Sequence, residues 1–153
     1  MIFSKTHEDP KKIIASIKKM KIPKFSKFSS FYFVVPEKFK EAPAMILTKF
    51  DELFGPMLNA RSHTFEATKH AKTLVQSKKE IFLGIGTRKP AGVANFRKFG
   101  LTPKADFGEF LSKAYYIIGK IQRENPPYFE KNLENYCRIA SRLFGQKISP
   151  IVE

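Results

Sequence analysis

Hydrophobic side chains recur at helical spacing in several stretches of the chain. Residues 10–21 place isoleucine and methionine on one side and lysine on the other, between a capping Asp9 and the helix-breaking Pro23, which predicts a basic amphipathic helix. The segment EAPAMILTKFDELFGP, residues 41–56, predicts a second helix that stops at its Gly-Pro pair. A third helix is predicted over SHTFEATKHAKTLVQSKK, residues 62–79, because its apolar side chains also recur on one side.

The last third of the chain carries the clearest helical pattern. A segment that starts from a Thr102 cap and Pro103 presents phenylalanine, leucine and isoleucine at helical spacing as far as Ile121. A second segment repeats the pattern from an Asn125 cap to a stop at Gly145. We expect these two helices to pair as a C-terminal helical hairpin.

Two stretches have the composition of β-strands. FSSFYFVVP, residues 28–36, is rich in aromatic and branched side chains, and EIFLGIG, residues 80–86, closes on glycines. No repeat and no long linker divides the chain. The pattern therefore predicts one α+β domain over residues 1–153, predominantly helical, in which a small sheet from residues near 28–35 and 79–85 packs with the C-terminal helical hairpin.

The charge of the chain is strongly positive. Its 153 residues carry 28 Lys and Arg against 14 Asp and Glu, a formal net charge of +14 at pH 7. Such a balance attracts polyanions, so nucleic acid is the first partner to consider. The one cysteine, Cys137, excludes an internal disulfide, and no secretory signal or membrane-spanning run is evident. We therefore expect a cytoplasmic protein.

Sequence motifs for cofactors and metals are missing. Gly84 and Gly86 lack the third glycine of a dinucleotide fingerprint, and there is no Gly-Lys-Ser/Thr of a P-loop. The chain also has no CxxC, no HExxH, no GxSxG and no acidic cluster that would gather magnesium. We expect no cofactor and no metal ion.

The positive charge is concentrated in residues 61–100, which hold nine basic and two acidic side chains. GTRKPAGVANFRKFGLTPK, residues 86–104, contains no acidic residue, and a short helix expected over about 90–99 would add its N-terminal dipole to the charge. That helix and the next resemble a helix-turn-helix in outline, although acidic side chains on the second fit groove reading badly. The sequence predicts binding of DNA or RNA with limited sequence preference. The predicted phosphate-binding residues are Lys69, Lys72, Lys78, Lys79, Arg88, Lys89, Arg97, Lys98 and Lys104.

A second hypothesis is catalytic. On a helix over 62–79, His63 and His70 would lie seven residues apart on one face, close to Arg61. Metal-independent RNA cleavage needs a base, an acid and a cation for the crowded phosphate, and these three residues would supply them. If the protein is an enzyme, this pattern indicates a small endoribonuclease of the toxin type. Surface histidines without a catalytic role remain the alternative.

A third hypothesis concerns residues 10–28. Their lysines flank an isoleucine and methionine stripe, which is typical of a helix that lies on an anionic membrane or meets a protein partner. Phe25 and Phe28, if exposed among the lysines, would instead stack on unpaired bases. The stripe could also simply dock on the domain core. The pattern favours no oligomeric state.

Overall fold

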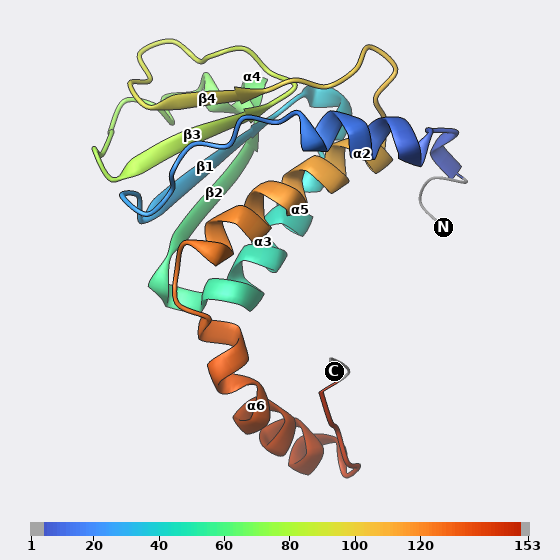
Figure 1. Cartoon of the computed structure of the whole chain (residues 1–153). Coiled ribbons are helices and arrows are strands. Elements are labelled where there is room, and N and C mark those ends of the chain that lie inside the picture. Colours follow the sequence, from blue (N-terminus) through green and yellow to red (C-terminus); the bar gives the residue numbers. More distant parts are fainter. Residues whose placement is uncertain (1–4, 151–153) are drawn as a thin grey trace.

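A parallel sheet forms the centre of the computed structural model, which describes residues 5–150 (Figure 1). The sheet has the strand order β2-β1-β3-β4, and each neighbouring pair is parallel. The strands are β1 (Ser30–Val35), β2 (Asn59–Thr64), β3 (Glu80–Ile85) and β4 (Phe96–Phe99). The two predicted strands are therefore confirmed, and they are the central ones, β1 and β3.

Strands and connecting segments alternate along the chain, so the fold is α/β rather than the predicted α+β. Helix α3 (Ala42–Phe54) leads from β1 to β2, and the short helix α4 (Phe65–Thr68) with a loop over 69–79 leads from β2 past β1 to β3. Parallel neighbours require such crossovers, because the chain must return to the same end of the sheet before each new strand. Helices make up 47% of the chain.

Two predicted helices are replaced by strand and loop. The first residues of the predicted helix over 62–79 belong to the end of β2. Within this range only α4 is helical. Ala71, with a φ of 58°, has the left-handed backbone conformation, which a continuing helix does not allow. Residues 96–99 form β4, so the helix expected over about 90–99 does not form. The helix-turn-helix outline is wrong for the same reason.

One face of the sheet is covered by helices. Figure 1 shows α2 (Pro10–Lys18), α3 and α5 (Phe107–Arg123) on the same side. Alternate residues of the central strands point toward this layer, and Phe31, Phe33 and Leu83 are fully buried in it. The amphipathic helix predicted over 10–21 is confirmed as α2, with its Asp9 cap and with Ile13 buried.

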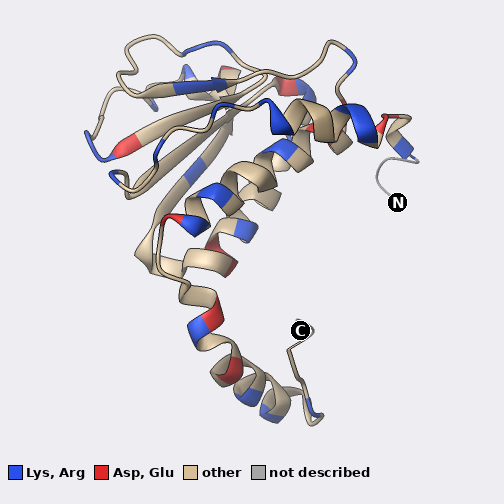
Figure 2. Cartoon of the chain, in the orientation of Figure 1, with Lys and Arg blue, Asp and Glu red and all other residues tan. Residues whose placement is uncertain are grey.

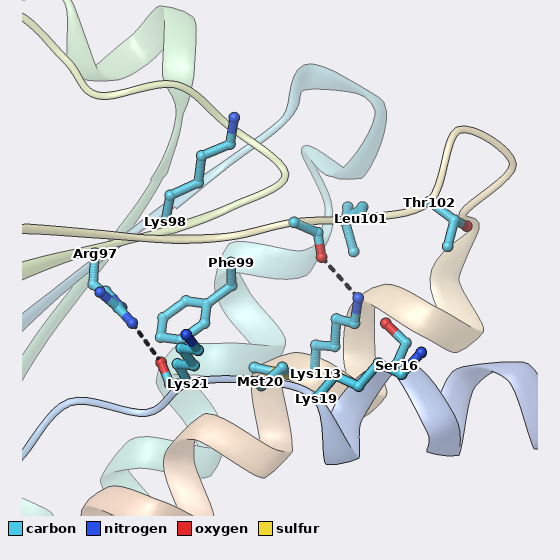
Figure 3. Close-up of a pocket in the computed structure, with 11 residues that line it drawn as sticks. Ser16, Lys19, Met20, Lys21, Arg97, Lys98, Phe99, Leu101, Thr102 and Lys113 are labelled. Carbon is cyan, nitrogen blue, oxygen red and sulfur yellow. Dashed lines mark hydrogen bonds between the residues drawn. The ribbon is translucent and has the colours of Figure 1, made fainter.

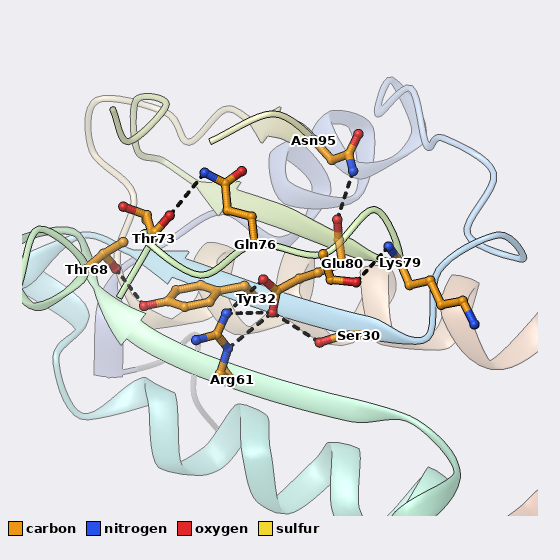
Figure 4. A network of polar contacts seen from close by, with 10 residues as sticks. Ser30, Tyr32, Arg61, Thr68, Thr73, Gln76, Lys79, Glu80 and Asn95 are labelled. Carbon is orange, nitrogen blue, oxygen red and sulfur yellow. Dashed lines mark hydrogen bonds and ion pairs between the residues drawn. The ribbon is translucent and has the colours of Figure 1, made fainter. Parts of the chain in front are cut away.

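The opposite face of the sheet is covered by loops and by α4. Tyr32, Val34 and Phe82 are buried there in a second, smaller cluster. The loops over 69–79 and 86–95 are joined by Gln76, whose Nε2 donates to the Gly92 carbonyl at 2.6 Å while its Oε1 accepts the Ala94 N–H at 3.2 Å. Figure 4 shows Gln76 next to the polar network on this face.

Two consecutive helices end the fold, as predicted, but their starts and their packing differ from the prediction. Helix α5 begins after an Asp106 cap rather than at Thr102, and α6 (Tyr128–Phe144) begins after Pro127 rather than Asn125. The stop at Gly145 is confirmed by its left-handed backbone. Helix α6 turns away from α5 and contacts α3 (Figure 1), so the two helices do not pack along each other as a hairpin.

A buried ion pair ties α5 to the segment that follows β4. Lys113 Nζ lies 2.6 Å from Glu109 Oε1 and also donates to the Gly100 carbonyl at 2.7 Å. Glu109 accepts two further hydrogen bonds, from the backbone and the hydroxyl of Thr102. Burial by itself raises the pKa of Glu109, but the hydrogen bonds and the charge of Lys113 outweigh it and hold the pKa below its ordinary value of 4.5.

We expect Glu109→Gln to destabilise the fold by about 3–5 kcal/mol, because the Lys113 ammonium is then left buried without its counter-charge. The unfolded chain protonates Glu109 at a higher pH than the folded chain does, so this stabilisation is complete above pH 4.5 and is lost as the pH falls further. The difference in unfolding free energy between wild type and variant should therefore shrink in acid. Urea unfolding at a series of pH values measures it.

The double variant Glu109→Leu with Lys113→Met is the control, because it removes both charges and leaves apolar side chains in their place. It should recover most of the lost stability. A Glu109→Gln variant as stable as the wild type at pH 7 would show that the ion pair does not matter for the fold.

Candidate nucleic-acid interface

The carboxyl ends of the four parallel strands meet at one edge of the sheet, which we call the carboxyl edge. The connections that follow β1 and β3 leave toward opposite sides, to β2 and to β4. In open parallel sheets such a divergence creates the crevice where ligands bind. A cavity of about 350 Å³ lies there, lined by Pro36 after β1, Gly86 after β3 and Gly100 after β4.

Seven basic side chains belong to the carboxyl edge, and we call them the carboxyl-edge cluster. They come from four places in the sequence, because one or two follow each strand and Lys98 lies within β4. Figure 2 shows Lys and Arg on β4 and on the loops before and after it. The cluster consists of Lys38, Lys69, Lys72, Arg88, Lys89, Lys98 and Lys104. Six of the nine predicted residues thus follow a strand or lie in β4, and Lys38 is an addition that the sequence pattern missed.

Acidic partners engage only part of the carboxyl-edge cluster. Lys38 donates to the Ala105 carbonyl at 2.7 Å and lies 3.5 Å from the Asp106 carboxylate. Lys69 pairs with Glu66 at 2.6 Å. For the other five cations, no ion pair is present among residues 5–150. The edge therefore keeps most of its positive charge available to a ligand.

The remaining three predicted residues lie elsewhere. Lys78 and Lys79 precede β3 and lie at the amino end of the sheet, where the Lys79 carbonyl accepts the N–H groups at the start of β1. Arg97 points to the opposite face of the sheet from Lys98, because neighbouring strand residues alternate. Its Nη2 donates to the Lys21 carbonyl at 2.9 Å (Figure 3). The single surface expected from the sequence is therefore divided.

Arg97 takes part in a second positive surface, which we call the α2–β4 groove. This cavity of about 370 Å³ lies between the end of α2 and the edge strand β4. Lys19 and Lys21 line it from one side and Arg97 from the other, and the buried Lys113 closes it, whereas the side chain of Lys98 points away from these residues (Figure 3). The groove adjoins the carboxyl edge through Lys98, which lines both cavities.

An aromatic ring lies among the cations where the second strand ends. Phe65 begins α4, and Lys69 Nζ and Arg88 Cζ each lie over its ring at 5.1 Å from the centroid. These three residues and Lys89 line a cavity of about 440 Å³, which we call the Phe65 pocket. No pattern in the sequence indicated this pocket, because Phe65 was expected on the buried side of a long helix.

The proposed catalytic residues do not lie on a helix. Arg61 and His63 belong to β2, and His70 follows α4 at the surface. The Arg61 guanidinium donates to both oxygens of the nearly buried Glu80 carboxylate at 2.8 Å and lies over the Tyr32 ring at 4.5 Å (Figure 4). This contact supports the sheet, so Arg61 is already engaged within the fold. The helical spacing that motivated the ribonuclease hypothesis is absent.

His63 lies beside Tyr32 on the same face, with ring centroids 5.6 Å apart. Burial, and then the positive charges of Lys72 and Arg61, hold the pKa of His63 below its ordinary value of 6.5. The lowered pKa favours the neutral form of the imidazole. A neutral imidazole can accept a proton, but the two nearby cations oppose the charge that it would then carry.

The third hypothesis needs residues 10–28 to offer an exposed surface, but part of this segment packs on the body of the fold. Phe25 and Phe28 are buried in the main core, so the prediction that they stack on bases is wrong. The N–H groups of Phe25 and Ser26 donate to the Glu124 carboxylate at 2.7 and 2.9 Å. Between residues 5 and 150, no helix is long and apolar enough to cross a membrane.

No group of three or more His, Cys, Asp or Glu side chains in the described part of the chain could hold a metal ion. Cys137 is buried on α6. Comparison with protein-family models, with curated proteins and with solved structures gives no match for this chain. The functional argument therefore depends on the geometry of the chain itself.

We expect Lys72→Gln to raise the pKa of His63 toward 6.5, because the variant removes a positive charge that opposes protonation of the imidazole. NMR titration of the histidine ring protons measures this pKa directly. Lys131→Gln, the same change of charge on α6, is the control and should leave the pKa of His63 unchanged. An unchanged pKa in Lys72→Gln would show that Lys72 does not lie close to His63 in solution.

Proposed function

We propose that this protein binds nucleic acid by holding phosphate groups along the carboxyl edge, with limited sequence preference. The observation that carries the proposal is the carboxyl-edge cluster. Its seven cations come from all four strand ends, and five of them have no ion pair among the described residues. Phosphates neutralise such side chains and release counterions from the nucleic acid, which is the main source of sequence-independent affinity.

The spread of the cations favours a polymer over a small anion. A single phosphate or carboxylate is held by donors that converge on one point. The cluster does not converge in this way, since Lys38 and Lys98 line one cavity while Lys69, Arg88 and Lys89 line another. Lys98 then connects the carboxyl edge to the α2–β4 groove, which adds Lys19 and Lys21. A chain of regularly spaced phosphates can contact all of these positions together.

The residue types argue for limited sequence preference. Six of the seven cluster members are lysines, whose flexible stems carry a point charge and do not offer the paired donors that recognise guanine. Contacts of this kind position a protein on the phosphate backbone without reading the bases. DNA and RNA are therefore both ligands to test.

The test compares two variants that each remove four positive charges. Arg88→Gln, Lys89→Gln, Lys98→Gln and Lys104→Gln together should weaken binding at low salt and flatten its salt dependence. On duplex DNA, the log-log slope should fall by about 0.9 for each phosphate that the variant no longer neutralises. Fluorescence anisotropy with labelled DNA and RNA, single-stranded and duplex, over a salt series measures both quantities.

The control variant carries Lys78→Gln, Lys79→Gln, Lys131→Gln and Arg142→Gln, at exposed positions on the amino end of the sheet and on α6. It should keep the wild-type salt slope, because its charges act only at long range. Equal weakening in both variants would mean that net charge alone causes binding and that the carboxyl edge is not the interface. Absence of wild-type binding to any of the four nucleic acids would disprove the function.

A further inference from the structure

The Phe65 pocket differs from the rest of the carboxyl edge because it combines an aromatic face with cations. The ring of Phe65 is half-buried and packs against the cluster of Tyr32 and Phe82 on the loop-covered face of the sheet. The rest of the ring lines the pocket. Because the ring packs against this cluster, it presents a fixed flat surface to a ligand.

The cations around the ring are placed to contact the phosphates on either side of a base that stacks on the ring. Lys69 and Arg88 each lie over the ring at 5.1 Å from the centroid, and Lys89 lines the same pocket. An aromatic ring that attracts a cation also stacks on nucleobases, and a guanidinium plane can do the same. A base that replaces Arg88 or Lys69 over the ring would free that cation for the neighbouring phosphate.

Hydrogen bonds join the walls of the pocket. The walls come from the loops over 69–79 and 86–95, which the side chain of Gln76 joins by hydrogen bonds to Gly92 and Ala94. Pro90, which is buried, adds a fixed backbone angle to the wall. A pocket formed before binding avoids the entropy cost of ordering loops around the ligand.

We infer that the Phe65 pocket takes an unpaired nucleobase, so that the protein prefers single-stranded to duplex nucleic acid. The inference rests on the proposed function and adds a ligand class to it. In a duplex each base is stacked and paired, and it cannot leave the helix without breaking those interactions. In a single strand the base is free to stack on Phe65 while its phosphates meet the cations of the pocket.

The experiment compares wild type and Phe65→Leu on single-stranded and duplex oligonucleotides of one sequence. Removal of the ring should weaken single-strand binding on the order of tenfold and leave duplex binding and the salt slope unchanged. A single strand that carries 2-aminopurine adds a direct readout, because stacking quenches its fluorescence. Quenching is expected with the wild type and should be absent with the variant.

Two further variants separate stacking from structure. Phe96→Leu changes a half-buried phenylalanine that packs on the same cluster but does not line the pocket, and it should bind single strands as the wild type does. Phe65→Tyr keeps an aromatic ring and should retain both affinity and quenching. Thermal unfolding of all variants checks that each one is folded.

The possible results show separately whether the base-stacking inference fails and whether the proposed phosphate binding fails. Wild-type binding that is unaffected by Phe65→Leu, or that is tighter for duplex, would overturn the inference and leave phosphate binding at the carboxyl edge intact. Equally weakened binding in Phe65→Leu and Phe96→Leu would assign the effect to packing and would also overturn it. If the wild type binds neither single-stranded nor duplex oligonucleotides, both proposals fail.

Discussion

The common direction of the four strands is the constraint on which the rest of the structure depends. Parallel pairing makes each connection return along a face of the sheet, so α3 runs along the face that α2 and α5 also cover, and α4 and two loops run along the other. It also brings every carboxyl end to one edge. Basic residues that are far apart in the sequence, from Lys38 to Lys104, belong to that edge because each follows a strand or lies near its end. In an antiparallel sheet the same residues would be shared between two edges.

The sequence allowed the central strands to be predicted but not the outer ones. SFYFVV and EIFLGI are buried on both faces, so they are apolar throughout and were recognisable as strands. NARSHT and FRKF form the edge strands β2 and β4, which carry half-exposed polar or charged side chains that hide the period-2 pattern. Without them the fold resembled a helical protein with a small sheet. The helix expected after β2 also failed, because Ala71 takes a positive φ that no periodicity reveals.

The candidate site, like the fold, was predicted only in part from the sequence. Charge density along the sequence identified the region from Lys69 to Lys104, because local composition needs no knowledge of the fold. The pattern could not show which charges share a surface. Arg97 and Lys98 are adjacent in sequence and point to opposite faces, since they belong to a strand and not to a helix. Lys38 and Phe65 were missed because the sequence pattern does not show that they belong to the carboxyl edge. Only the order of the parallel strands shows this.

The cations of the carboxyl edge also differ in the interactions that each must break before it can contact a phosphate. Lys38 and Lys69 would leave the carboxylates of Asp106 and Glu66, whereas Lys89, Lys98 and Lys104 have no ion pair within residues 5–150. Arg88 is intermediate, because it would leave the ring of Phe65. A base that stacks on that ring would remove this cost, since it takes the place of the guanidinium and releases it toward the phosphates. Phosphate binding and base stacking would thus be coupled through a single side chain.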